Sequence, residues 1–178
     1  MKVILISGKA QHGKDTVADM ICRRLRGDNH KVLVTHYADL LKFICAYYFG
    51  WDGIKDENGR RLLQYVGTDV VREKNPSLWV DFVSTMLTYF NGNWDYVIIP
   101  DCRFPNEVSR MAERFDTVYI RVERPNFVSK LTPEQLAHPS ETALDDYEPD
   151  FRFINDSSKS ELLAKVSLWI KEKLYGEG

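Results

Sequence analysis

The chain has 178 residues, which is enough for one domain with a substantial core but too few for two ordinary domains. Its formal net charge is −2, with 44% hydrophobic and 28% charged residues. This balance excludes a protein that binds nucleic acid or an anionic membrane through a global positive charge. No apolar run approaches the roughly 18 residues that a membrane-spanning helix needs. We therefore expect a soluble protein with neither nucleic acid nor membrane as a partner.

Three cysteines, Cys22, Cys45 and Cys102, show neither a C-x-x-C motif nor metal-ligand spacing. A sparse, odd number of cysteines is typical of free thiols in a reducing cytoplasm. The first apolar run is too short for a signal peptide and leads directly into a glycine, so it is expected to form a buried strand. The sequence thus indicates a cytoplasmic protein, and it leaves open whether two copies form a homodimer.

The most informative segment follows this first apolar run. Residues 3–6 read Val-Ile-Leu-Ile, and residues 8–14 read Gly-Lys-Ala-Gln-His-Gly-Lys, which matches the spacing G-x-x-x-x-G-K. An amphipathic helix is expected to follow and to end near residue 27. Such a strand, glycine-bounded loop and helix form a phosphate cradle, because the loop N–H groups and the helix N-terminus favour negative charge. Residues 8–14 are therefore predicted to be a phosphate loop, with Lys14 reaching the outer phosphates.

Two residues after the loop lysine are candidates for binding Mg²⁺. Asp15 stands where the motif normally has a metal-binding hydroxyl, and Thr16 comes one position late. Asp15 is either a ligand of the metal, directly or through water, or a first-turn residue favoured by the helix dipole. In the second case Thr16 takes the phosphate or Mg²⁺ contact. Lys9, inside the loop, either contacts phosphate or is solvated, and His12 belongs to no zinc-like cluster.

The rest of the chain alternates between short apolar strands and helices. Asn75 is predicted to be the N-cap of a helix that starts with Pro76, and capping boxes are predicted at Thr132 and Ser158. In chain order we predict a strand at 32–34, a helix at 38–49, a loop at 50–59, helices at 60–73 and 76–90, a strand at 96–100, a helix at 105–114, strands at 117–122 and 151–154, and a final helix after 158.

This alternation predicts an α/β fold, a parallel sheet with helices on both faces. Ligands of such sheets gather at the carboxyl ends of the strands. The loops at Gly8, at 36–39, at 101–103 and from Arg124 onward should therefore surround one cleft. All four loops carry polar or charged residues, so the expected geometry agrees with the chemistry.

Several charged residues fall in these loops. Asp101 ends a strand, where a carboxylate can hold Mg²⁺ through water or steer an acceptor phosphate; the alternative is a cap for the following helix. Arg103 suits a bidentate phosphate contact, or else forms a surface ion pair with Glu107. Arg124 is a candidate for a mobile loop that closes over the transferring phosphates, whereas Arg121 alternates within a strand and can simply face solvent.

Two other features have structural interpretations. Trp79, in the helix that follows Asn75-Pro76, is expected in the core rather than stacked on a base. The acidic run at 145–150 is expected to be a solvated turn.

Taken together, the motifs resemble those of the P-loop deoxynucleoside monophosphate kinases of the bacteriophage type. That family also carries an aspartate after the loop lysine. The resemblance covers nearly the whole chain except about residues 44–58. It rests on residues 8–16 with their Gly-Lys-Asp-Thr ending, 60–64 with 67–69, 79–80, 99–103, 122–125, 138–142 and 154–156.

The resemblance implies a three-layer P-loop NTPase fold that spans residues 1–178 as a single kinase domain, with a parallel sheet of about five strands. It also implies acceptor-binding helices within 37–92 and a lid-like segment at 123–149. The implied reaction transfers a phosphoryl group from ATP, with Mg²⁺, to a (deoxy)nucleoside monophosphate. The partners would be small-molecule nucleotides.

The site residues fall into four groups, some of them shared. The residues expected to bind ATP are Gly8, Lys9, Gly13, Lys14, Asp15, Thr16 and Asn155, the last near the adenine. Those expected to bind the acceptor are Asp39, Lys42, Gln64, Thr68, Arg72, Asp101, Arg103 and Glu141. The metal candidates are Asp15, Thr16 and Asp101, and the catalytic candidates are Lys14, Arg103 and Arg124.

Two other functions remain open at this stage. One is a P-loop kinase for another small acceptor, such as phosphomevalonate or dephospho-coenzyme A, and the other is a non-catalytic nucleotide-sensing module. A monophosphate acceptor is already largely anionic near neutral pH, so its phosphorylation needs alignment and charge neutralisation more than a base. A hydroxyl acceptor would need a base, for which Asp39 is the candidate. The sequence does not reveal the preferred base or sugar.

Overall fold

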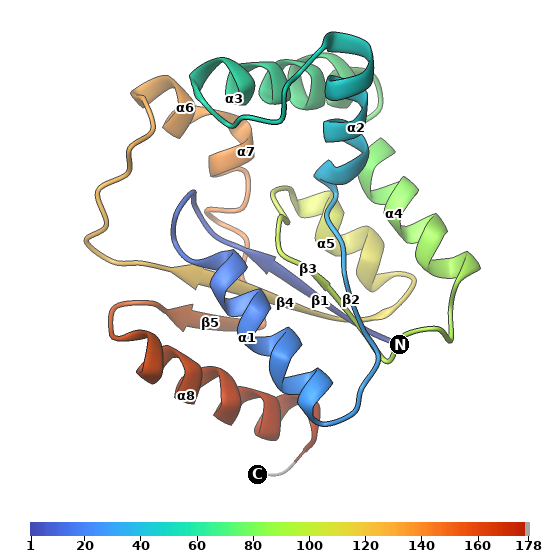
Figure 1. The fold of residues 1–178 in the computed structure, drawn as a ribbon, viewed down its shortest axis with the longest axis vertical. Helices are drawn as coiled ribbons and strands as arrows, with labels where there is room; N and C mark the ends of the chain where they lie inside the picture. Colours follow the sequence, from blue (N-terminus) through green and yellow to red (C-terminus); the bar gives the residue numbers. More distant parts are fainter. Residues whose placement is uncertain (177–178) are drawn as a thin grey trace.

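Five parallel strands form the centre of the computed structural model, which describes residues 1–176 (Figure 1). The strand order is β2-β3-β1-β4-β5, and every neighbouring pair is parallel. The predicted parallel sheet of about five strands is therefore confirmed. The strands are β1 (Lys2–Ser7), β2 (Val32–Val34), β3 (Tyr96–Ile99), β4 (Asp116–Glu123) and β5 (Phe151–Ile154).

The helices connect these strands in the order that the sequence predicts. Two segments, η1 and η2, wind as π-helices, which the sequence does not signal. The helical elements are α1 (Lys14–Gly27), α2 (Ala38–Phe49), α3 (Glu57–Gln64), η1 (Tyr65–Arg72), α4 (Leu78–Tyr89), α5 (Pro105–Ala112), α6 (Pro133–Ala137), α7 (Pro139–Thr142), α8 (Lys159–Trp169) and η2 (Ile170–Leu174).

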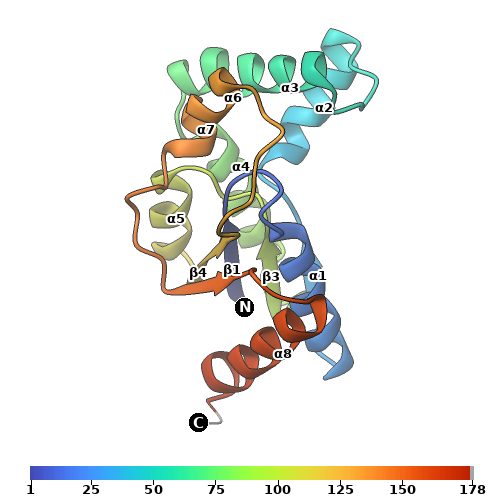
Figure 2. The same ribbon diagram turned by 90° about the vertical axis from the view of Figure 1, so that its left-hand side faces the viewer.

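Both faces of the sheet are buried. Side chains alternate across a strand, so Val3 and Leu5 of β1 face one apolar cluster, whereas Ile4 and Ile6 face another. The first cluster includes residues of α2, α4 and α5, and the second includes residues of α1 and α8. Figure 2 shows α5 and α1 on opposite sides of the sheet. Continuous apolar strands are expected for a parallel sheet covered on both faces.

Two helix starts differ from the prediction. The helix expected at 60–73 begins three residues earlier, because the Asp56 side chain accepts a hydrogen bond from Gly59 N at 2.7 Å and caps it. The prediction of Asn75 as an N-cap is wrong. Its side chain instead accepts a bond from Ser77 N in a local turn, and α4 starts at Leu78.

The predicted capping boxes at Thr132 and Ser158 are confirmed, since each hydroxyl accepts the N–H three residues ahead.

Above the carboxyl ends of the strands lie α2, α3, α6 and α7 (Figure 1). Within residues 1–176, no helix has both the length and the apolar character required to cross a bilayer.

Candidate active site

A cavity of about 590 Å³ lies at the carboxyl ends of the strands, between the phosphate loop and the helices above it. Its volume falls in the range of small-molecule sites. It brings together many of the residues that the sequence predicts to form the site. From the phosphate loop and the start of α1 it is lined by Ala10, Gln11, Lys14 and Asp15, from the helices by Lys42, Gln64, Thr68, Arg72 and Trp79, and between them by Asp101, Arg103 and Glu141.

The phosphate loop depends on two glycines. Gly8 has φ +143° and Gly13 has φ +102°, a conformation that side chains oppose. A Cβ on Gly8 would lie 2.3 Å from the carbonyl oxygen of Val122, and a Cβ on Gly13 would lie 2.6 Å from Asn155 Nδ2. Asn155 Nδ2 also donates to His12 O at 3.0 Å, so this amide supports the loop from outside the cavity. Its place near the adenine stays a prediction.

Lys14 is a buried cation of the cavity, with 8% of the residue exposed. Its Nζ donates to Gly8 O at 2.8 Å and to Lys9 O at 2.9 Å. Burial, and after it the charge of Arg103, lower the pKa of Lys14 to about 7, although Glu141 partly offsets both. An anionic ligand would reverse this shift, because it would favour the ammonium form.

Asp101 lies at the end of β3, one strand from the phosphate loop. Its Oδ1 accepts from Tyr37 N and its Oδ2 from Ala38 N, both at 3.0 Å. The alternative that it caps the following helix is therefore wrong, since it satisfies N–H groups at the start of α2 instead. Each carboxylate oxygen keeps a further lone pair, so Asp101 can still accept a bond from the cavity side.

Arg103 faces a carboxylate that lies far away in the sequence. Its Nη1 donates to Glu141 Oε1 at 2.6 Å and to Ser140 O at 3.1 Å. The predicted alternative, a side-chain ion pair with Glu107, is wrong, because Glu107 Oε2 accepts the backbone N–H of Arg103 at 2.6 Å. Among the described residues, Nη2 and Nε of Arg103 have no partner, so this edge is available to a phosphate.

The acceptor candidates Gln64, Thr68 and Arg72 all come from α3 and η1, at intervals of four residues, and all line the cavity. Trp79 is buried, and its Nε1 donates to Gly67 O at 3.0 Å. Its predicted place in the core is confirmed, although one side of the residue also reaches the cavity wall.

Glu107 lines the cavity, whereas the sequence predicts for it only a surface ion pair with Arg103. It is only 1% exposed, and its Oε1 accepts from Arg72 Nη2 while its Oε2 accepts from two backbone N–H groups. The Arg72 guanidinium also lies 3.8 Å from the centre of the Phe104 ring. Burial raises the pKa of Glu107, whereas Arg72 and the N–H groups lower it. The one signal in the sequence is a glutamate at the third position of a helix that starts with Pro105.

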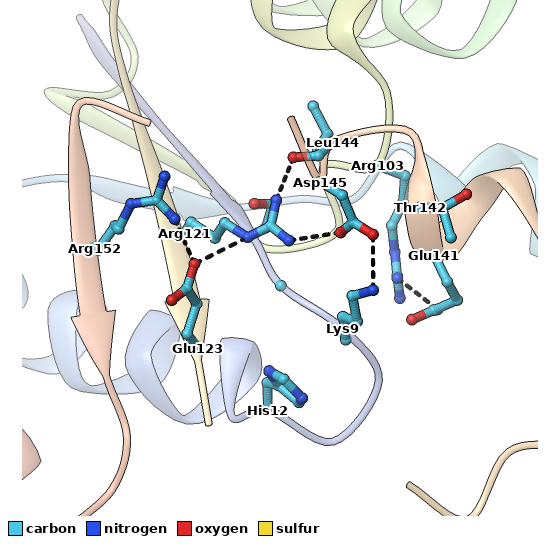
Figure 3. Close-up of polar contacts among 12 residues, drawn as sticks. Lys9, His12, Arg103, Arg121, Glu123, Glu141, Thr142, Leu144, Asp145 and Arg152 are labelled. Carbon is cyan, nitrogen blue, oxygen red and sulfur yellow. Dashed lines mark hydrogen bonds and ion pairs between the residues drawn. The ribbon is translucent and has the colours of Figure 1, made fainter. Parts of the chain in front are cut away.

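Figure 3 shows a chain of alternating charges that ends at the phosphate loop. Asp145 bonds Lys9 Nζ at 2.8 Å and Arg121 Nη2 at 2.7 Å; Arg121 approaches Glu123, which in turn pairs with Arg152. Arg121 is 8% exposed, so the interpretation that it faces solvent is wrong. The acidic run at 145–150 is also more than a solvated turn, because Asp145 is paired twice.

The segment that follows β4 enters the cavity, but Arg124 does not. Leu131 and Gln135 line the cavity, whereas the Arg124 guanidinium lies 4.7 Å from the Phe127 ring centre. The backbone N of Arg124 donates to His12 Nδ1 at 3.1 Å. Arg124 therefore does not line this cavity, and its role on a loop that closes over the transferring phosphates stays a prediction.

Other predicted residues flank the cavity without lining it. Asp39 pairs with Lys42 Nζ at 2.9 Å and accepts from His36 N at 3.1 Å, and only Lys42 and His36 belong to the lining. The predicted residues outside the lining are Gly8, Lys9, Gly13, Thr16, Asp39, Arg124 and Asn155.

Comparison with solved structures supports the fold. The APS kinase CysC of Mycobacterium tuberculosis matches with a TM-score of 0.53 and 15% identity over 96% of both chains. Shikimate kinase from Aquifex aeolicus matches with a TM-score of 0.52 and 15% identity over 99% of both chains. At this identity the likeness shows a shared P-loop kinase fold and nothing about the acceptor.

Sequence comparison identifies the family. The deoxynucleotide monophosphate kinase of Enterobacteria phage T4 is 34% identical over 114 residues, which are 63% of this chain but 45% of the relative. An uncharacterised protein, ORF77 of Ictalurid herpesvirus 1 (strain Auburn), is 27% identical over 169 residues, 94% of this chain and 69% of that protein. The chain thus spans about half the length of the phage T4 relative. Residues 52–166 match the family description "Deoxynucleotide monophosphate kinase", and this chain belongs to that family.

Proposed function

We propose that this protein transfers the γ-phosphoryl group of ATP to the phosphate of a deoxynucleoside monophosphate, giving ADP and the deoxynucleoside diphosphate. The observation that carries the proposal is one cavity whose lining runs from Lys14 at the phosphate loop to Arg72 and Gln64 on the helices. Arg103 lies between the two ends. Such a cavity can hold two phosphate-bearing ligands with their phosphates facing each other.

The residues divide the work of this reaction. A phosphate oxygen of the acceptor attacks the γ-phosphorus, the bond to the β–γ bridging oxygen breaks, and the electron pair leaves with ADP. The attacking oxygen is already anionic near neutral pH, so no side chain has to take its proton. Lys14 and the free edge of Arg103 would neutralise the charge on the transferring group. Arg72, Gln64 and Thr68 would hold the acceptor.

Mg²⁺ fits the donor set of the cavity. Within residues 1–176, no three side chains of the metal-ligating types come together, so the protein alone makes no metal cage. Mg²⁺ usually keeps several waters and binds one or two carboxylates together with substrate phosphates. Asp15 and Asp101 both line the cavity and can supply such carboxylates. The metal would neutralise phosphate charge that Lys14 and Arg103 leave uncompensated.

The surrounding segments have separate roles in this proposal. The helices within 37–92 form the acceptor side, and α6 and α7, within the segment 123–149, cover the cavity as a lid. The three buried free cysteines fit a protein that works in a reducing cytoplasm.

A coupled assay for ADP tests the acceptor. We expect ADP release to depend on a deoxynucleoside monophosphate in a panel that also holds ribonucleoside monophosphates, phosphomevalonate and dephospho-coenzyme A. The control reaction contains ATP and Mg²⁺ without acceptor. Turnover with phosphomevalonate or dephospho-coenzyme A alone would reject the proposed acceptor, and ADP release that ignores every acceptor would reject the transfer.

Nucleotide binding is expected to take up a proton at pH 8. With a pKa of about 7, Lys14 is mostly neutral at that pH in the free protein. A polyphosphate beside its Nζ favours the charged form and raises the pKa, so the lysine gains close to one proton. Titration calorimetry in two buffers that differ in ionisation enthalpy measures this uptake. Equal uptake by wild type and by Lys14→Met would assign the proton to another group.

A further inference from the structure

Glu141, at the end of α7, joins the phosphate loop to Arg103. Its Oε2 accepts the backbone N–H of Ala10 at 2.9 Å, and its Oε1 accepts Arg103 Nη1 at 2.6 Å. The Glu141 side chain is 7% exposed, so this contact lies largely out of solvent. One carboxylate therefore fixes both a loop amide and the arginine that faces the cavity.

Asp145 repeats this arrangement four residues later. Its Oδ2 accepts from Lys9 Nζ at 2.8 Å and its Oδ1 from Arg121 Nη2 at 2.7 Å (Figure 3). Unlike Glu141, it does not line the large cavity. Its effect on a ligand in that cavity must therefore act through Lys9, the loop residue that it contacts.

The turn that carries Asp145 is anchored to the sheet. Arg121 Nη1 donates to Leu144 O, and the Leu144 side chain is buried in the core. Arg121 of β4 is opposite Ser7 of β1, the residue directly before the loop. Arg121 and the last strand residue before the loop thus occupy neighbouring positions at the end of the sheet, so the turn can hold the loop without depending on α6.

We propose that Glu141 and Asp145 are positioning residues of the phosphate loop: they hold its first half, residues 8–10, against Arg103 and Arg121 before nucleotide arrives. A cradle of N–H groups binds phosphate more tightly when it is already ordered, because binding then costs less conformational entropy. The inference rests on the proposed function only in that the loop binds ATP. It does not depend on the identity of the acceptor.

Asp145→Ala tests the inference through nucleotide affinity. We expect the dissociation constant of a non-hydrolysable ATP analogue to rise about fivefold in calorimetry, since partly exposed ion pairs contribute modestly. Asp145→Asn, which keeps an acceptor oxygen, should lie between Asp145→Ala and wild type. The matched control is Asp146→Ala, because Asp146 is exposed and forms no hydrogen bond or ion pair with the described residues. An Asp145→Ala affinity equal to that of Asp146→Ala would overturn the inference.

A double-mutant cycle with Lys9→Met tests the route of the effect. If Asp145 acts through Lys9, the double variant should bind nucleotide no more weakly than Asp145→Ala alone. Effects that add would mean that Lys9 and Asp145 act independently, which contradicts the inference. In turnover, Asp145→Ala should raise the KM for ATP while the acceptor KM and kcat stay within about threefold. A purely structural loss would change the acceptor KM as well.

The outcomes separate this inference from the proposed function. If no deoxynucleoside monophosphate is phosphorylated but Asp145→Ala still weakens binding of the analogue, the acceptor is wrong and the inference stands. If the wild type transfers phosphate normally and Asp145→Ala binds the analogue like wild type, only the inference falls.

Discussion

Replacing Lys14 with methionine should lower phosphoryl transfer by about three orders of magnitude, the upper end of what one preorganised donor contributes in an active site. Lys14 is a buried cation of the cavity, and methionine keeps most of its length and volume while removing the charge. The loss should appear in kcat, because the charge on the transferring group develops mainly in the transition state. The same ADP assay, with the preferred acceptor, measures it.

The Lys14→Met variant should remain folded and gain stability at pH 7 and below. The folded-state pKa of Lys14, about 7, lies below its usual value of 10.5, so folding disfavours the charged form. As pH rises from 7 toward 10.5, the unfolded chain holds the proton that the folded chain has lost, and wild-type stability increases. The advantage of Lys14→Met should therefore shrink over that range. Lys171→Met, at an exposed position, is the control; near-normal turnover of Lys14→Met would defeat the role assigned to Lys14.

The second large effect is expected at Glu107. Glu107→Ala should lower the free energy of unfolding by about 3 to 5 kcal/mol, the range for breaking a buried ion pair. The change leaves the Arg72 guanidinium, which is largely buried, without its counter-charge. It also removes the acceptor for the backbone N–H groups of Arg103 and Phe104. Urea denaturation measures the difference, since it reports the free energy of unfolding directly.

A second ion pair on α5 gives a matched control. Arg110 pairs with Asp81 of α4 at 2.8 Å, but these side chains are 40% and 39% exposed. Asp81→Ala should therefore cost no more than about 1 kcal/mol. Replacing both Arg72 and Glu107 by apolar residues should recover much of the loss, because no buried charge is then left alone. A Glu107→Ala cost as small as that of Asp81→Ala would contradict the importance of burial at this pair.

Much of the fold could be predicted because its signals are local. The apolar runs at 3–6 and 96–100 alternate with helices, and this pattern alone predicts a covered parallel sheet. The Thr132 and Ser158 capping boxes were identifiable because the hydroxyl and its partner lie three residues apart. The start of α4 was mispredicted because Asn75 can bond either a helix N–H or a turn N–H, and the local sequence does not decide between them.

The phosphate loop could also be predicted, because its motif lies within residues 8–14. The hydrogen bonds between site residues could not be predicted, because they join residues that are far apart in the sequence. Arg103 and Glu141 are separated by 37 intervening residues, and only the folded chain brings them together. The sequence favours Glu107 as the partner of Arg103 because Glu107 lies four residues further on, in the first turn of the helix that follows Arg103. Arg121 was ambiguous for a related reason: alternation in a strand shows which face a side chain takes, but not what covers that face.

The contact between Asp101 and the start of α2 affects the electrostatic field that bound phosphates would meet in the cavity. If the proposed ATP and deoxynucleoside monophosphate bind on either side of Asp101, its carboxylate would by itself repel both. Here the backbone N–H groups of Tyr37 and Ala38, at the positive end of α2, donate hydrogen bonds to the Asp101 oxygens and offset part of their negative charge. In the proposed reaction α2 would thus weaken the negative field between the two ligands, and any shift of α2 away from the sheet would restore that repulsion.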